Sequence, residues 1–203
     1  AAAWAEAAGE PGAALSAGFD KARALHFQGD PGAQRHTEQA LTLARTVGDR
    51  RIETAALNQM GILASELGHH GLARDYYQQS LQAARANNDR ALESGVLNNM
   101  GDTERSVGHY GAALELLQAG LRVSREIGQR MSEAYMLCNL AWISHARGNM
   151  TESLGWAEQA MVLARQVKDR DLEASILCTQ GHALAALGKT SEATEAYRGS
   201  LAI

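Results

Sequence analysis

Apolar positions recur along this chain with the spacing of amphipathic α-helices. In residues 49–67, Leu57, Met60 and Ala64 stand at i, i+3 and i+7, which places them on one helix face. Residues 70–86 follow a similar rule, with apolar or small side chains at i, i+4, i+7, i+8 and i+11. These side chains are Ala73, Tyr77, Ser80, Leu81 and Ala84. The pattern predicts a helix A over 49–67 and a helix B over 70–86, joined by a short turn.

The same helix pair repeats with a period of 40 residues. Six classes of position keep one register, which coincidence does not produce. The classes are Arg50, Arg90, Arg130 and Arg170; Glu53, Glu93, Glu133 and Glu173; Leu57, Leu97, Leu137 and Leu177; Arg45, Arg85, Arg125 and Arg165; Gly68, Gly108, Gly148 and Gly188; Leu41, Leu81, Leu121, Met161 and Leu201. We therefore predict an all-α fold, a right-handed α-solenoid of antiparallel helix pairs without strands.

The register predicts a single solenoid domain over 1–203. Its five repeats have the approximate ranges 12–48, 49–88, 89–128, 129–168 and 169–203. Residues 1–8 have the pattern of the tail of a preceding helix B, and residues 190–203 that of the start of a last one. This amounts to about eleven helices, the first and last incomplete. We interpret the chain as a segment of a longer protein.

Glycine and other small residues mark the turns and the close helix contacts. Gly68 suits the left-handed conformation that ends a helix, and Asp49 can cap the helix that follows it. Inside the helices, small residues recur at two further positions of the repeat. They are Gly61, Gly101, Ala141 and Gly181, and then Ala73, Ala113, Ser153 and Ala193. Because a Gly inside a helix costs about 1 kcal/mol relative to Ala, its recurrence predicts that a neighbouring helix fills the space beside it.

These spacings resemble the tetratricopeptide repeat, in which a large residue, an apolar residue and Gly are followed by Ala, an aromatic and a small residue. The pattern is present as Leu57, Met60, Gly61, Ala73, Tyr77 and Ser80, and again as Leu177, Gly181, Ala193, Tyr197 and Ser200. The common form of the repeat has 34 residues and a Pro near the end of helix B. The longer form found here is similar to Pins-type adaptors and to bacterial MalT-type signalling arrays.

Composition narrows the functional classes. Hydrophobic residues make up 45% of the chain and aromatic residues 5%, which suits a closely packed helical stack. The net charge is −4 and no basic stripe is present, so direct nucleic-acid binding is not expected. The chain shows neither a signal peptide nor a run of about 18 apolar residues that would span a membrane. We expect a cytoplasmic location.

Motifs that would indicate catalysis are absent from the sequence. There is no Gly-rich phosphate loop, no G-x-S-x-G and no H-E-x-x-H. The charged residues that recur with the period have a structural explanation, since Arg50 and Glu53 stand at i, i+3 and can pair on the helix surface. We expect neither an enzyme nor a cofactor.

The two cysteines, Cys138 and Cys178, occupy the same position in successive A helices. Packed helices lie about 8–10 Å apart, whereas a disulfide needs Cα atoms within about 7 Å, so a disulfide is disfavoured. His145 and His182 could complete a soft-metal site with both thiols. The alternative, which we favour because no Cys-x₂-Cys clip is present, is that the cysteines fill space and that there is no metal.

The resemblance implies a binding groove. In tetratricopeptide arrays the A helices line the concave surface, and the residues on either side of the recurrent Gly face a guest. In Pins-type arrays an Asn two residues before that Gly holds the backbone of an extended peptide. Asn99 and Asn139 match this position, Gln59 is close to it, and Thr179 departs from it. The predicted peptide-binding residues are Asn58, Gln59, Asn98, Asn99, Asp102, Arg105, Asn139, Trp142, His145, Thr179 and His182.

Three functional interpretations remain open. The first is a scaffold that binds a protein or peptide in the groove. The second is a regulatory array of a larger bacterial signalling protein, such as a transcription activator, signalling ATPase or cyclase, that binds a small effector or mediates autoinhibition. The third is self-assembly, because both chain ends carry apolar faces and would favour an end-to-end homodimer of the segment. The groove amides could also be solvated polar residues without a guest.

Overall fold

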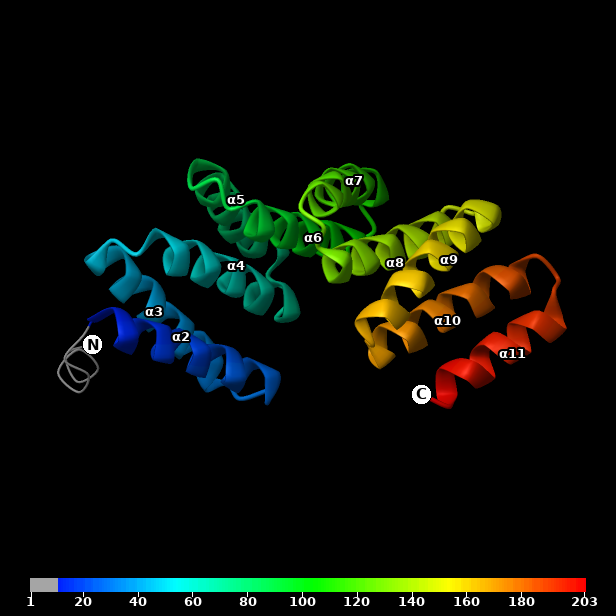
Figure 1. Cartoon of the computed structure of the whole chain (residues 1–203), viewed down its shortest axis with the longest axis horizontal. Coiled ribbons are helices and arrows are strands. Elements are labelled where there is room, and N and C mark those ends of the chain that lie inside the picture. The colour runs from blue at the N-terminus through cyan, green and yellow to red at the C-terminus, as the bar shows by residue number, and fades with distance from the viewer. Residues whose placement is uncertain (1–10) are drawn as a thin grey trace. The chain divides into compact units, whose positions relative to one another are not determined.

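The structure is a computed structural model that describes residues 11–203. All regular secondary structure in this range is helical (Figure 1), which confirms the predicted fold class. The helices are α2 (Pro11–Phe27), α3 (Gly32–Val47), α4 (Arg50–Glu66), α5 (His70–Ala86), α6 (Arg90–Ser106), α7 (Tyr110–Glu126), α8 (Arg130–Ala146), α9 (Met150–Val167), α10 (Arg170–Ala186) and α11 (Thr190–Leu201). The predicted helix tail at residues 1–8 lies outside the described residues.

The chain divides into two compact units between Asn99 and Met100, a point inside α6. In the first unit, α2 packs on α3 and α4 on α5, and α4 also contacts α2 and α3. In the second unit, α8 packs on α9 and α10 on α11, and α10 also contacts α8 and α9 (Figure 1). Even-numbered helices are therefore the A helices of the repeat and odd-numbered helices are the B helices.

The helix ends follow the local sequence. The Asp49 carboxylate accepts a hydrogen bond from the Ile52 backbone N–H at 2.9 Å and caps α4, as predicted. Asp169 caps α10 in the same way, accepting from the Leu172 N–H at 3.0 Å. Gly68 has φ of +76°, a left-handed conformation that ends the helix before it and that favours glycine.

The recurrent glycines inside the A helices mark the predicted close contacts. A Cβ at Gly61 would lie 2.5 Å from the ring of Tyr77, and a Cβ at Gly181 would lie 2.5 Å from the ring of Tyr197. In the α8–α9 pair the residue at the Gly position is Ala141, and the residue at the Tyr position is Ala157. In the α4–α5 and α10–α11 pairs, a Gly on helix A thus packs against a Tyr on helix B. The α8–α9 pair has two small residues at these positions instead.

The last described helix exposes an apolar face. Leu41, Leu121 and Met161, which share a repeat position, are 8%, 5% and 7% exposed, whereas Leu201 at the same position is 88% exposed. The difference follows from the repeat, because each helix B is covered by the helix A that follows it. End-to-end association through such a face stays a prediction.

Candidate functional site on the A helices

Two predicted groove residues of the first unit, Asn58 of α4 and Asn99 of α6, lie within hydrogen-bond distance of each other. The Asn99 side-chain N–H donates to the Asn58 side-chain oxygen at 3.1 Å. Both residues are half-buried. The pair joins two A helices and keeps one amide oxygen and several N–H donors for other partners.

Gln59 lies deeper than the sequence alone indicates. It is 7% exposed, and its Nε2 is a buried donor without a hydrogen-bond partner among the described residues. A buried amide without a partner costs about 1–3 kcal/mol relative to a satisfied one. The buried amide of Gln59 therefore lowers the stability of the first unit.

In the second unit, three predicted groove residues form one cluster. Arg105 donates to the Asp102 carboxylate from both Nε, at 2.9 Å, and Nη2, at 2.5 Å. Its guanidinium carbon lies 4.7 Å from the centroid of the Trp142 ring, a cation–π contact. Tyr110, which the sequence analysis did not include, packs edge-on against Trp142 with ring centroids 5.9 Å apart. We name Asp102, Arg105, Tyr110 and Trp142 the Arg–Trp cluster.

Cys138 lies next to the Arg–Trp cluster. Burial, with a smaller contribution from the charge of Asp102, raises the pKa of its thiol to about 11 against the opposing charge of Arg105. The thiol is therefore protonated at neutral pH, whereas metal ligation and nucleophilic attack need the thiolate. Both cysteines are free.

The two predicted histidines come together further along the same helices. The rings of His145 and His182 have centroids 5.7 Å apart, and His182 also contacts the Tyr197 ring at 5.5 Å. Burial lowers the pKa of His145, and the charge of His182 lowers it further. Within residues 11–203, no group of three His, Cys, Asp or Glu side chains has a metal-binding arrangement. The contact that the two histidine rings make between α8 and α10 is an aromatic one.

The remaining predicted positions have contrasting surroundings. Thr179 is buried and its hydroxyl donates to the Ser175 carbonyl at 3.1 Å within its own helix. Asn98 and Asn139 are half-buried and have interaction partners. Among the predicted positions on the A helices, Asn58, Asn99, Asp102, Arg105 and Trp142 carry half-buried polar or aromatic side chains. Thr179 is buried and does not offer its hydroxyl to a guest.

Two apolar side chains of α8 were not predicted. Met131 and Tyr135 are 52% and 39% exposed, and the Tyr135 hydroxyl donates to Asp169 Oδ2 at 2.8 Å. Their sequence signal was the spacing i, i+4 and i+11 shared with Trp142, which places all three on one helix face. They lie ten and six residues before Ala141, outside the positions next to the recurrent small residue from which the groove was predicted.

The recurrent charges have structural partners. Arg50 pairs with Glu53 at 3.1 Å, as predicted, and Arg45 of the preceding helix B binds the other oxygen of the same carboxylate at 3.0 Å. The bridge from helix B to the next helix A recurs in both units, as Arg45–Glu53, Arg85–Glu93, Arg125–Glu133 and Arg165–Glu173. Burial raises the pKa of Glu93, but hydrogen bonds from Arg85 and Arg90 outweigh it, and the pKa lies below its usual value. These residues hold helices together.

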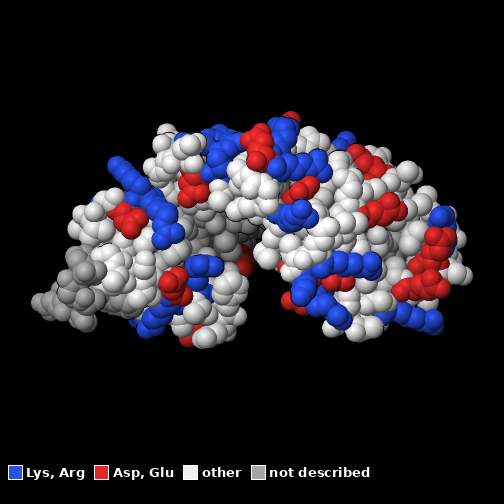
Figure 2. All heavy atoms as spheres, viewed as in Figure 1, with Lys and Arg blue, Asp and Glu red and all other residues white. Residues whose placement is uncertain are grey.

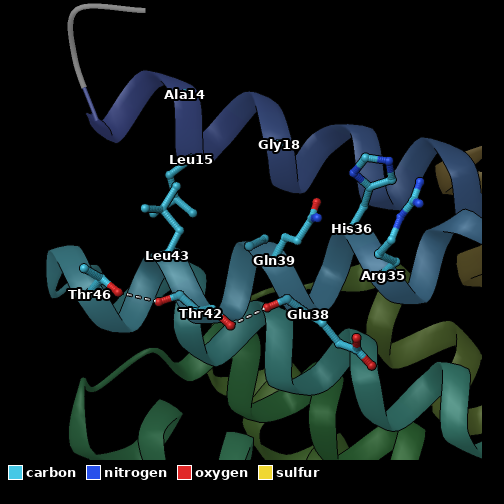
Figure 3. Close-up of a pocket in the computed structure, with 11 residues that line it drawn as sticks. Ala14, Leu15, Gly18, Arg35, His36, Glu38, Gln39, Thr42, Leu43 and Thr46 are labelled. Carbon is cyan, nitrogen blue, oxygen red and sulfur yellow. Dashed lines mark hydrogen bonds between the residues drawn. The ribbon is translucent and has the colours of Figure 1, made fainter. Parts of the chain in front are cut away.

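A separate pocket of about 540 Å³ lies between α2 and α3 in the first unit (Figure 3). Leu15 and Leu43 form much of its apolar wall, and Arg35 and His36 lie at one end. The hydroxyls of Thr42 and Thr46 donate to carbonyls of their own helix, those of Glu38 and Thr42, at 2.9 Å each. The pocket offers mainly apolar surface and contains none of the predicted groove residues.

The charge pattern agrees with the composition. On the face shown in Figure 2, Lys and Arg side chains are interspersed with Asp and Glu side chains on both units. Such a surface lacks the continuous basic stripe that binds a phosphate backbone. No helix within residues 11–203 is both long and apolar enough to cross a bilayer.

Comparison with known proteins shows one family of repeats. Residues 54–87 and residues 132–203 match models of the tetratricopeptide repeat. No curated protein matches the chain at a significant level.

Several solved structures share the fold. BtubC (BKLC) from P. vanneervenii is 15% identical, covering 93% of this chain and 87% of BtubC, with a TM-score of 0.67. A putative kinesin light chain from Podosopora anserina with nearly identical TPR-like repeats is 16% identical, covering 95% of each chain, with a TM-score of 0.70. The Rap protein complexed with Competence and Sporulation Factor is 18% identical with a TM-score of 0.80. That match covers 91% of this chain, which spans about half, 53%, of the Rap chain.

Proposed function

We propose, from the premise that this chain contains tetratricopeptide repeats at residues 54–87 and 132–203, that it is a scaffold that binds a protein or peptide along its A helices. The observation that carries the proposal is the Arg–Trp cluster. Three of its residues were chosen from the repeat register: Arg105 contacts both Asp102 and Trp142, and all three are half-buried. Aromatic and Arg side chains held in one geometry are frequent anchors of protein interfaces.

The amides of the A helices supply the second part of the proposed site. Asn58 and Asn99 already share one hydrogen bond, which orients both amides. An amide offers a donor and an acceptor, and the backbone of an extended guest needs both. The proposal follows the resemblance to Pins-type adaptors, and it gives Asn99 and Asn139 the role of holding the guest backbone.

A regulatory array within a larger bacterial signalling protein is the second candidate. The observation behind it is the fold shared with Rap, whose structure holds Competence and Sporulation Factor. At 18% identity the likeness concerns the fold, and a shared fold does not fix function. The two candidates share the binding face and differ in the guest, which is a partner protein in the first and an effector or a neighbouring domain in the second.

Substitution of the two asparagines tests the proposed backbone contacts. Asn99→Ala and Asn139→Ala should each weaken binding of the guest by about 1–3 kcal/mol, because a guest polar group is left buried without its partner. Isothermal titration with a peptide selected against the whole chain measures this. Asn99→Ala also removes the hydrogen bond to Asn58, so the melting temperature of each variant is recorded as a control. Reduced stability with unchanged affinity for both variants would contradict the proposed role.

A further inference from the structure

The side of α8 that carries Trp142 has an apolar stripe that extends beyond the Arg–Trp cluster. Met131, Tyr135, Cys138 and Trp142 stand at i, i+4, i+7 and i+11, and at about 100° per residue they fall within one narrow face of the helix. We name these four residues the α8 stripe. Met131 and Tyr135 are among the exposed large hydrophobic residues of the second unit. Exposed apolar residues that are contiguous on one face indicate an interaction surface.

The stripe is specific to this repeat. The positions of Met131 and Tyr135 are occupied by small or polar side chains in the other A helices that follow the 40-residue register. The pairs are Arg51 and Ala55, Ala91 and Gly95, and Asp171 and Ser175. Because the repeat scaffold forms without large apolar residues at these positions, packing of the repeat does not explain Met131 and Tyr135.

Carboxylates surround the polar end of Tyr135. Its hydroxyl donates to Asp169 Oδ2 at 2.8 Å, while Asp169 Oδ1 caps α10 by accepting from the Leu172 N–H. Burial, the hydrogen bond to Asp169 and the charges of Asp169 and Asp171 together raise the pKa of Tyr135 to about 12. The tyrosine is neutral at physiological pH, and an electronegative ring face lies beside two carboxylates.

The basic side chains near this end are Arg130, Lys168 and Arg170. Arg130 donates to the side chain of Gln166 on α9, which places its charge toward the B helix. Lys168 and Arg170 are exposed residues of the α9–α10 turn. The charges of Asp169 and Asp171 are among those that raise the pKa of the Tyr135 hydroxyl. Arg105 lies at the other end of the stripe, over the Trp142 ring. The two carboxylates therefore favour a cation at the Tyr135 end of the stripe.

We propose that the α8 stripe selects guests in which a large apolar residue lies next to a Lys or Arg. The apolar side chain packs on Met131 and Tyr135. The cation lies between the Tyr135 ring and the carboxylates of Asp169 and Asp171, where a cation–π contact and charge attraction act together. The inference rests on the proposed function, and it names the class of guest.

Selection from a library of random dodecapeptides against the whole chain tests the inference. The recovered sequences should be enriched in pairs of a large apolar residue with Lys or Arg. Binding of the strongest peptide should weaken by about fivefold or more in Met131→Ala and in Tyr135→Ala, as expected for anchor residues of an interface. Asp171→Asn should weaken binding less, and its effect should fade as salt is added.

Val162→Ala is the matched control, because Val162 is an exposed apolar residue, 57% exposed, on helix B of the same repeat. It should leave the affinity unchanged, and Tyr135→Phe should keep most of the apolar contact. Enrichment of acidic peptides, or peptides insensitive to Met131→Ala and Tyr135→Ala, would overturn the inference.

The outcomes also separate the inference from the function on which it rests. Peptides that respond to Asn99→Ala and Asn139→Ala but not to the α8 stripe variants would overturn the inference alone. A library without any enriched peptide would overturn both. Sedimentation that shows self-association of the chain, lost in Met131→Ala, would assign the stripe to a second copy and would likewise overturn the inference.

Discussion

Gln59, at the scale of a single residue, is a polar side chain of the predicted groove that lies buried in the first unit. Its side chain is 7% exposed, and its Nε2 has no hydrogen-bond partner in the described part of the chain. Selection for stability alone would replace such a residue by an apolar one of similar volume. Its presence in the groove register agrees with a role in binding.

Replacement of Gln59 by Leu should raise the stability of the chain. Removal of the unpartnered amide should increase the free energy of unfolding by about 1 kcal/mol, because its desolvation is no longer uncompensated. Chemical denaturation measures the change. Gln78→Leu is the control, since Gln78 is exposed on α5 and should change stability little. A loss of stability in Gln59→Leu would show that the amide has a partner, such as an ordered water.

The site could be predicted from the sequence to the extent that it follows the repeat register. Asp102, Arg105 and Trp142 were predicted because they flank the recurrent small residue. Tyr110 was missed because it belongs to the first turn of a B helix, where the register carries no common residue type. The contact of Arg105 with the Trp142 ring depends on side-chain rotamers on two helices, and no pattern along the chain encodes them.

Helix pairs are the elements of this fold, and the contact between Gly61 and Tyr77 holds one of them together. The pair α8–α9 uses Ala141 and Ala157 at the same two positions. The sequence therefore contains two combinations at these two positions, a Gly with a large ring and a pair of small alanines. The boundaries of α4 (Arg50–Glu66) were predicted closely, since the capping Asp49 and the helix-ending Gly68 are local signals.

Gly61→Ala should destabilise the chain by about 1–3 kcal/mol, because the added methyl group overlaps the Tyr77 ring. Gly71→Ala is the matched control. A Cβ at Gly71 meets no atom within 4 Å, so this variant should be neutral or more stable through helix propensity. The double variant Gly61→Ala/Tyr77→Ala should lose about 1 kcal/mol less stability than the sum of the losses in the two single variants. Strict additivity, measured by thermal unfolding, would contradict the direct contact.

At the scale of the whole molecule, the repeat explains why the proposed binding residues lie mainly on the A helices. Each helix B is held by the Arg–Glu bridges to the next helix A and by its own apolar face. The A helices contribute polar and aromatic side chains to the proposed site, including Asn58, Asn99, Asp102, Arg105 and Trp142. The arrangement of all five repeats as a single solenoid stays a prediction.

Hydrogen–deuterium exchange with and without a selected peptide tests the central claim most directly. Amides of a helix exchange more slowly where a bound guest suppresses local opening. The account predicts slower exchange in the A helices α4, α6, α8 and α10, and little change in the B helices α5, α7 and α9. Protection confined to the B helices, or to the α2–α3 pocket, would contradict it.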